Sequence, residues 1–157
     1  MKYLLMFSLV LMTSLSADRL KIEAKDFTAD EKKGVSVFTG NVKIKKGADE
    51  LNASKVTVYT NENKKVDKFV AVGNVKFYIK TETNDIYQGR AQKAILKPLE
   101  KSYHFFTDVY LTQINKKKEI TGEEVYINTI KGEVLAKGAK KKPVIMIFDL
   151  AEDDEKK

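Results

Sequence analysis

Three stretches of the chain repeat one short pattern, and this repetition restricts the fold more than any other feature of the sequence. Val37–Ile44 reads VFTGNVKI, Val70–Phe77 reads VAVGNVKF, and Phe105–Leu111 reads FFTDVYL, a weaker copy. Their central valines are separated by 33 and 34 residues. A period of this length is typical of stacked architectures, in which one unit cannot bury its apolar face alone and neighbouring units cover it.

Within and between the copies, apolar and polar residues alternate with a period of two, which indicates β-strands. Val75, Phe77 and Ile79, for example, alternate with Lys76 and Tyr78. Similar alternation occurs at 20–23, 38–44, 56–59, 109–111 and 125–127, with turn-forming residues at 32–34, 46–47 and 61–63. The sequence therefore predicts an all-β fold built from antiparallel strand pairs of about 33 residues each, with a helix expected only in the first 17 residues.

Two glycines of the repeat, Gly40 and Gly73, fall inside strand patterns and predict β-bulges or a close approach of the backbone. A second set of related runs lies between the copies, and each run opens on a small residue, at Ala24, Ala53, Gly89 and Gly122. Each unit is thus expected to pair one strand of the first kind with one strand of the second kind.

The first 17 residues have the organisation of a secretory signal peptide: Lys2, an apolar run over 4–15, and small residues over 14–17. The run is shorter than the roughly 20 apolar residues of a membrane span, although an uncleaved N-terminal anchor remains the alternative. We expect one domain over 18–150 and a charged, disordered tail over 151–157. The chain has no cysteine, so neither disulfides nor thiolate chemistry is expected.

The chain is basic, with 29 Lys and Arg against 22 Asp and Glu and a net charge of +7. The lysines cluster at 32–33, 45–46, 64–65, 116–118 and 140–142, where turns are expected. Such clusters keep a β-protein soluble and protect its sheet edges, or they attract an anionic partner. Outside the cytoplasm a phosphorylated glycolipid or an acidic glycan is a better candidate for that partner than nucleic acid.

The chain carries no recognisable catalytic, cofactor or metal-binding pattern. Its single histidine, His104, has no partner histidine or cysteine, and Asp26 and Asp30 fit no metal-binding loop. Glu123 and Glu124 have the character of solvated side chains. We therefore expect a binding protein without cofactor or metal, and not an enzyme.

The combination of three segments resembles the OstA-like domain of the LptA/OstA-like family of periplasmic lipopolysaccharide transport proteins. These segments are Leu20–Asp26 (LKIEAKD), Val37–Val42 (VFTGNV) and Leu51–Val58 (LNASKVTV). The resemblance covers about residues 18–148. It implies a β-jellyroll of stacked antiparallel strands, open along one side, that binds the acyl chains of lipid A in its apolar interior.

The resemblance places family groove positions at Leu20, Ile22, Phe77 and Leu96, whereas Pro98 stands where the family has an apolar groove residue. The alternation adds further candidate lipid contacts that are equally explained as ordinary core: Phe38, Val42, Val56, Val75 and Val109. Lys43 and Lys76 are expected on the opposite, outward face.

The resemblance also implies end-to-end assembly that bridges an inner-membrane LptC-like partner and an outer-membrane LptD-like partner. The run Val144–Leu150 is apolar on both faces, which favours head-to-tail pairing with the N-terminal strand around 20–24 of another copy. Folding of this run over its own core is the alternative. Two other functions stay open: an LptC-like subunit anchored in the inner membrane, and a secreted β-solenoid adhesin or glycan-binding module.

Overall fold

The computed structural model describes residues 19–150, so the predicted signal peptide and charged tail lie outside the described residues. The part of the chain that it describes holds no helix long and apolar enough to cross a membrane. The strands are β1 (Leu20–Glu23), β2 (Asp26–Asp30), β3 (Val35–Lys46), β4 (Asp49–Thr60), β5 (Val66–Lys80), β6 (Ile86–Lys97), β7 (Ser102–Gln113), β8 (Lys118–Asn128), β9 (Glu133–Lys137) and β10 (Ile145–Phe148). A short 3₁₀ turn, η1, spans Ile114–Lys116.

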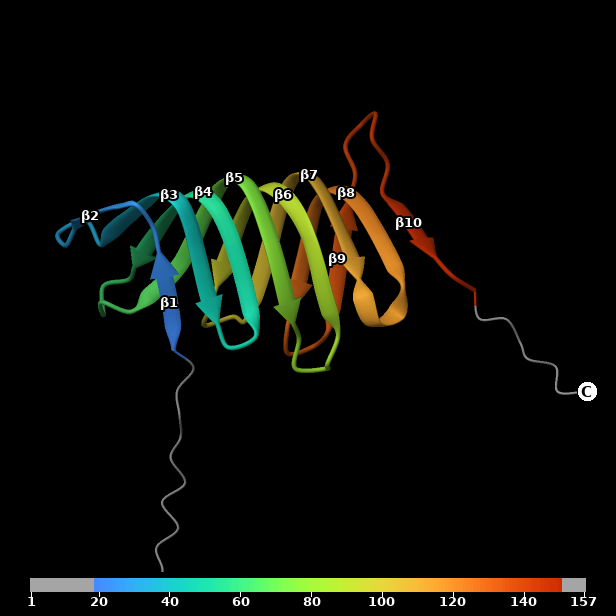
Figure 1. Ribbon diagram of the computed structural model, residues 1–157, viewed down its shortest axis with the longest axis horizontal. Coiled ribbons are helices and arrows are strands. Elements are labelled where there is room, and N and C mark those ends of the chain that lie inside the picture. Colours follow the sequence, from blue (N-terminus) through green and yellow to red (C-terminus); the bar gives the residue numbers. More distant parts are fainter. Residues whose placement is uncertain (1–18, 151–157) are drawn as a thin grey trace, which may run out of the picture.

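All strands belong to one antiparallel sheet in the order β1-β3-β4-β5-β6-β7-β8-β10 (Figure 1). β2 also pairs with β3, and β9 also pairs with β8. At each end of the stack, therefore, two short strands lie along the two halves of one long neighbour. The sheet does not close on itself, which confirms the predicted β-jellyroll of stacked strands that is open along one side.

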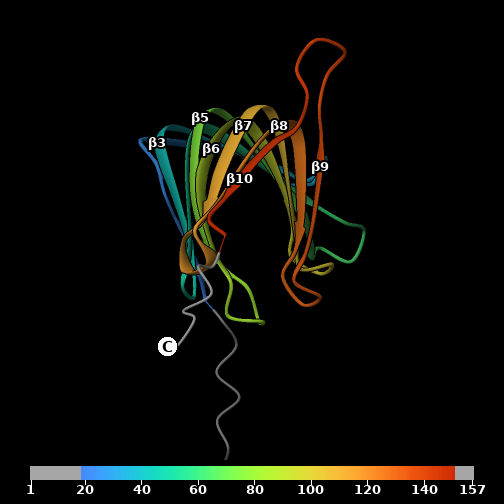
Figure 2. The same cartoon turned by 90° about the vertical axis from the view of Figure 1, so that its right-hand side faces the viewer.

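The sheet folds sharply over itself, so that the end-on view has the form of an arch (Figure 2). The fold line runs through bulges in β3, β5 and β7, where the register shifts by one residue. Gly40 and Asn41 both have positive φ there, as do Gly73 and Asn74. The prediction of bulges at the two glycines is confirmed, since glycine adopts this backbone conformation without steric cost.

The weaker third copy makes the same bulge without glycine. Thr107 and Asp108 have φ of 67° and 50° and occupy the positions of the Gly-Asn pairs. All three copies of the repeat thus form the same local structure, a bulge at the fold line of the sheet. A β-branched residue in the left-handed region is strained, so the third bulge is held by its surroundings.

The fold line divides the sheet into two walls. The first wall holds β2, β9 and the strand halves at 35–39, 55–60, 66–72, 93–97, 102–106 and 124–128. The second wall holds β1, β10 and the halves at 42–46, 49–53, 75–80, 86–91, 109–113 and 118–122. The two walls face each other across the interior of the arch.

Each repeat valine pairs with a small residue just past the fold line. The pairs are Val42 with Ala53, Val75 with Ala91, and Val109 with Gly122. The small partners leave room for the valines, all of which are 0% exposed. The prediction that Gly89 is the small residue equivalent to Ala53 and Gly122 is therefore wrong by two residues, because Ala91 is the residue that pairs with Val75.

Gly89 serves another purpose, since it lies in register between Phe77 and Leu111. A Cβ there would meet the backbone oxygen of Tyr110 at 2.1 Å, so only glycine permits this approach of the strands.

The lysine clusters do not all lie in turns. Lys32 and Lys33 occupy a turn, as expected, but Lys45 and Lys46 end strand β3 and continue its alternation. Lys45 points outward and pairs with Glu50 at 3.2 Å, whereas Lys46 falls on the inward face. The alternation of inward and outward side chains therefore continues through Lys46, where the sequence predicted the start of a turn.

Candidate functional site

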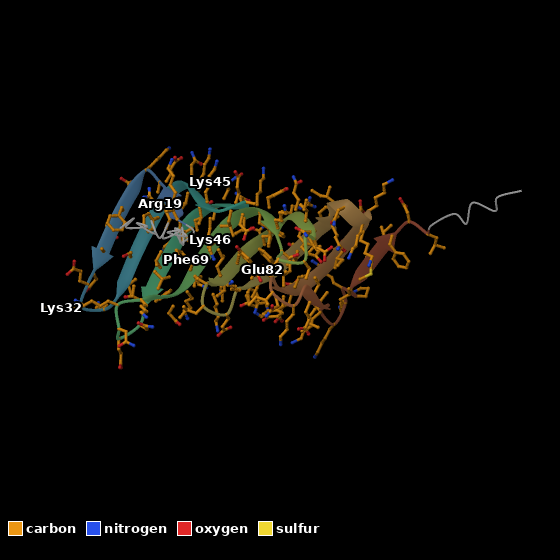
Figure 3. The ribbon with its side chains drawn as sticks, turned by 90° about the horizontal axis from the view of Figure 1, so that it is seen from below. Arg19, Lys32, Lys45, Lys46, Phe69 and Glu82 are labelled. Carbon is orange, nitrogen blue, oxygen red and sulfur yellow. The ribbon has the colours of Figure 1, made fainter. Side chains whose placement is uncertain are left out.

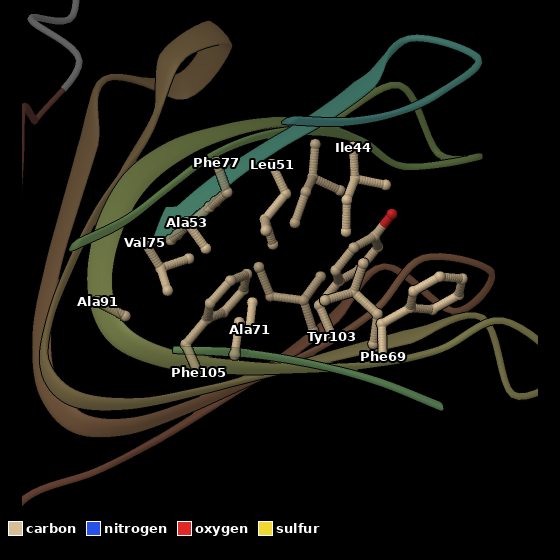
Figure 4. Close-up of a cluster of buried hydrophobic side chains, with 14 of the residues drawn as sticks. Ile44, Leu51, Ala53, Phe69, Ala71, Val75, Phe77, Ala91, Tyr103 and Phe105 are labelled. Atoms are coloured by element: carbon tan, nitrogen blue, oxygen red, sulfur yellow. The ribbon is translucent and has the colours of Figure 1, made fainter. Parts of the chain in front are cut away.

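The interior of the arch is a continuous apolar cluster contributed by both walls (Figure 4). Its centre is the stacked pair of Phe77 from the second wall and Phe105 from the first, with ring centroids 3.8 Å apart. Asp85 is the buried charged side chain among the described residues, and it lies outside this cluster. Such a surface can retain acyl chains through the hydrophobic effect alone.

A cavity of about 230 Å³ opens at the free edges of the two walls. Its apolar lining comes from both sides: Leu20, Ile44 and Leu51 of the second wall face Phe69 and Leu96 of the first. Its rim is polar and comes from the β3–β4, β5–β6 and β6–β7 turns. The cavity therefore offers an apolar interior beneath a charged mouth, which suits an amphiphile.

All of the predicted lipid-contacting residues lie on the inward face, at different depths. Leu20 and Leu96 line the cavity. Ile22 and Phe38 are partly buried near the N-terminal end of the stack, where they pack against the core. The others are fully enclosed within the core: Val42, Val56, Val75, Phe77 and Val109. Lys43 and Lys76 are exposed on the outward face, as predicted.

The sequence reasoning missed several residues of the cavity. Ile44 continues the alternation of Val42 along β3, and Leu51 is its register partner in β4. Phe69 and Tyr103 come from the other wall, and no local signal shows that this wall faces the first set. Pro98, which breaks the family pattern, lies in the β6–β7 turn at the rim of the cavity.

Polar contacts tie the two walls together across the mouth. The hydroxyl of Tyr103 donates to Oδ2 of Asp49 at 2.5 Å, which joins residues from opposite walls. Lys101 Nζ lies 2.8 Å from Glu82 Oε1, and the Glu82 amide donates to the carbonyl of Thr129 at 2.9 Å. Burial, with the Asp49 charge, raises the pKa of Tyr103, so its hydroxyl stays a donor at neutral pH.

A second polar cluster closes the free edge of the second wall. Asp85 is buried and accepts hydrogen bonds from Gln113 at 2.9 Å and from Lys116 at 3.0 Å. Burial by itself raises the pKa of Asp85, but the hydrogen bonds of Lys116 and Gln113 and the Lys116 charge outweigh it and hold the pKa below its usual range. This cluster fixes the β5–β6 turn against η1 and β7.

His104 does not face the interior. Its Nε2 lies 2.6 Å from Oε1 of Glu124 on the outward face of the first wall. Its ring lies against Phe106, with centroids 4.1 Å apart. No group of three or more metal-ligating side chains occurs in the described residues.

The two ends of the stack present strands with one neighbour only. β1 and β2 pair with β3, and β9 and β10 pair with β8. Every residue of β10 is about half exposed, between 49% and 57%. The C-terminal run therefore extends the sheet as a terminal strand and does not fold over the core.

Comparison with known proteins places this geometry in a family. A family model described as the LptA/(LptD N-terminal domain) LPS transport protein matches residues 21–133. Among solved structures, the fold is similar to that of LptH from Pseudomonas aeruginosa, described as the LptA homologous periplasmic component of the lipopolysaccharide transport device. The two superpose with a TM-score of 0.74 at 17% identity, over 84% of this chain and 96% of that one. A search of the curated proteins finds no match.

Proposed function

The chain belongs to the LptA/(LptD N-terminal domain) family of lipopolysaccharide transport proteins, and on this premise we propose that it is a periplasmic carrier that holds the acyl chains of lipid A between its two walls. The single observation that carries the proposal is the uninterrupted apolar interior that opens at one side. A transport protein for an amphiphile needs such a surface and needs no catalytic group.

The interior of the arch is packed against itself, so acyl chains enter by separating the walls. The cavity at the mouth is the starting point, since Leu20, Ile44 and Leu96 already line open space there. Deeper entry exchanges contacts such as the Phe77–Phe105 stack for contacts with the lipid. Acyl burial contributes about 25 cal/mol for each Å² removed from water, which offsets the lost side-chain contacts.

The free ends of the stack support a second part of the proposal, which is head-to-tail assembly. β10 of one copy would pair with β1 of the next copy, or with a partner of the same fold at either membrane. The expected partners are an LptC-like protein at the inner membrane and an LptD-like protein at the outer membrane. Pairing unlike ends produces an open chain of subunits, as a bridge across the periplasm requires.

Photo-crosslinking in cells tests the proposed groove. Probes at Ile22, Phe77 and Leu96 should capture lipopolysaccharide, whereas the same probe at Lys43 or Lys76 should not. The paired positions Phe77 and Lys76 are adjacent in β5 and face opposite ways, so they control for expression and local structure. Equal capture from both faces would rule out a one-sided apolar groove, and capture of sugar without acyl chains would favour a glycan-binding module.

A further inference from the structure

The β5–β6 turn, residues 81–85, crosses the open side of the arch, and we call it the strap. Figure 2 shows it in yellow-green between the lower edges of the two walls. The Glu82 amide donates to the carbonyl oxygen of Thr129 at 2.9 Å, and the Glu82 carboxylate lies 2.8 Å from Nζ of Lys101. Thr129 donates through its amide and its hydroxyl to the carbonyl of Lys101, each at 3.0 Å. The strap thus links the second wall to two turns of the first wall.

The strap covers only one part of the open side. A Cβ on Gly132, in the β8–β9 turn, would lie 2.7 Å from Oγ1 of Thr83 in the strap, whereas a Cβ on Gly47, in the β3–β4 turn, would have nothing within 4 Å. Figure 3, which looks onto the open side, shows Glu82 farther along the stack toward the C-terminal strands than Phe69. Phe69 and the strap both line the cavity, so the strap forms its C-terminal boundary.

An apolar pair lies buried next to the strap. Ile79 in β5 and Tyr87 in β6 are register partners at the inward position nearest the free edge, and they are 1% and 3% exposed. The same position in β3 and β4, beside the cavity, holds Lys46 and Asp49. The strap and the opposite wall therefore keep the C-terminal part of the groove closed, while the N-terminal part opens to solvent through the cavity.

The strap is held firmly at its base and weakly at its tip. At the base, the buried Asp85 accepts hydrogen bonds from Gln113 and Lys116 of the same wall. At the tip, the side chains of Glu82 and Lys101 are about half exposed. An ion pair in contact with solvent contributes little to stability. The strap can therefore release the first wall while its base stays fixed to the second wall.

We propose that the strap is a gate within the groove: acyl chains bind first in the cavity on its N-terminal side and pass toward β8 and β10 only when it releases the first wall. The inference rests on the proposed function and concerns the route of the lipid through the same groove. In the proposed head-to-tail assembly the next copy adjoins the C-terminal end. A lipid that crosses the subunit must therefore pass the strap.

An engineered disulfide locks the strap and tests the gate. The chain has no cysteine. The Cβ position of Gly132 lies 3.4 Å from Cβ of Thr83, close to the separation of about 3.8 Å in disulfides. Thr83→Cys, Gly132→Cys therefore introduces one reversible cross-link between the walls. Photo-crosslinking probes at Ile22, on the N-terminal side, and at Ile120, an inward residue of β8, report how far lipopolysaccharide moves in the purified mature chain.

Both probes should capture lipopolysaccharide in the reduced variant. Oxidation should lower capture at Ile120 by about tenfold or more and leave capture at Ile22 within about twofold, because it removes the open state of the strap. Each single-cysteine variant, treated with the same oxidant, is the control and should retain capture at both positions.

Three other results would overturn the gate. Equal capture at Ile120 in the oxidised and reduced protein would show that lipid passes a closed strap, while the proposed function stands. Loss at both Ile22 and Ile120 on oxidation would show that the lipid does not enter on the N-terminal side. If neither probe captures lipid in the reduced variant or in the otherwise unaltered chain, the proposed function is wrong as well.

A second pair of variants does not depend on Gly132, whose φ of 64° strains any other residue. Glu82→Gln removes the ion pair with Lys101 and should raise the initial rate of capture at Ile120 about twofold. The matched control is Glu100→Gln, which removes a carboxylate paired at 3.5 Å within the first wall and should leave the rate unchanged. An unchanged rate in Glu82→Gln would overturn the gate even if the cysteine variant does not fold.

Discussion

The middle of the stack and its two ends are built from the same kind of strand but differ in completeness. Strands β3 to β8 are 11 to 15 residues long and cross the fold line without interruption. At each end, two short strands of four or five residues take the place of one long strand. These are β1 and β2 at the N-terminal end and β9 and β10 at the C-terminal end. Every residue of β2 and of β10 is exposed.

The difference separates the strands that contribute most of the buried core from the strands that expose apolar surface to solvent. In the middle, the buried core side chains are packed between neighbouring strands and the opposite wall. At the ends, one neighbour is absent from the described chain, and apolar residues such as Phe27 and Phe148 stay about half exposed. The middle is therefore the folded scaffold, and the ends are the surfaces to which the proposed function assigns assembly.

The largest difference in stability between a substitution in the middle and one at an end of the stack is expected for Phe105. Phe105→Ala removes a fully buried ring from the stack with Phe77 and should lower the free energy of unfolding by about 3–5 kcal/mol. Phe27→Ala, in terminal strand β2, makes the same chemical change at a side chain that is 58% exposed and should cost less than about 1 kcal/mol. Urea denaturation of both variants measures the difference, and equal costs would contradict the division into scaffold and ends.

The next effect concerns assembly. A chain ending at Lys142 lacks β10 and should stay folded, because β10 contributes no residue to the core cluster. Its self-association should weaken about a hundredfold, which corresponds to about 2.8 kcal/mol and to the loss of a few strand hydrogen bonds. Sedimentation velocity across a concentration series measures this. A folded, shortened chain that still forms concentration-dependent oligomers would place the joint elsewhere.

A smaller effect is expected at Asp85, which holds the β5–β6 turn in the middle of the stack. Asp85→Asn removes a buried charge that accepts from Lys116 and Gln113, and should cost about 2 kcal/mol at neutral pH. Because the folded-state pKa of Asp85 is depressed, this contribution is complete above the usual aspartate pKa and is lost as the pH falls through the folded value.

The pH dependence separates this effect from a simple packing loss. The difference in unfolding free energy between the unaltered chain and Asp85→Asn should shrink as the solution is acidified below the usual aspartate range. Asp26→Asn, on the exposed strand β2, is the control and should change little at any pH. A cost for Asp85→Asn that stays constant with pH would show that the charge is not what stabilises the turn.

The smallest effect distinguishes the three bulges. Thr107 has φ of 67° where the other copies have glycine, so Thr107→Gly should relieve backbone strain and stabilise the protein by about 1 kcal/mol. Gly73→Ala, at φ of 88° and with Ser54 side-chain atoms 2.9 Å from the new Cβ, should destabilise it. Thermal unfolding of both variants checks the opposite signs. A destabilised Thr107→Gly would mean that the threonine side chain, and not the backbone, sets the third bulge.

Much of this architecture can be read from alternation and repetition. The inward residues of β3 and β5 and the bulges at Gly40 and Gly73 follow from a period of two interrupted by glycine. The third bulge was harder to predict because Thr107 carries no glycine signal.

What the sequence does not reveal is which distant residues meet. Tyr103 and Asp49 are 54 positions apart, and their hydrogen bond depends on how the two walls face each other. The sequence also does not indicate that Lys46 points inward, for a different reason. A lysine pair before a glycine has the character of a turn, and the strand pairing with β1 and β4 overrides this local tendency.

Native mass spectrometry of the untagged chain, purified from the periplasm of its own cells without detergent extraction, tests the central claim most directly. If the arch holds acyl chains between its walls, a fraction of the protein should carry a non-covalent mass equal to one lipopolysaccharide molecule. Phe77→Asp, which places a charge inside the groove, should remove that mass if the variant stays folded, whereas Lys76→Asp on the outward face should retain it. Lipid-free protein throughout, or lipid retained equally by both variants, would contradict the account.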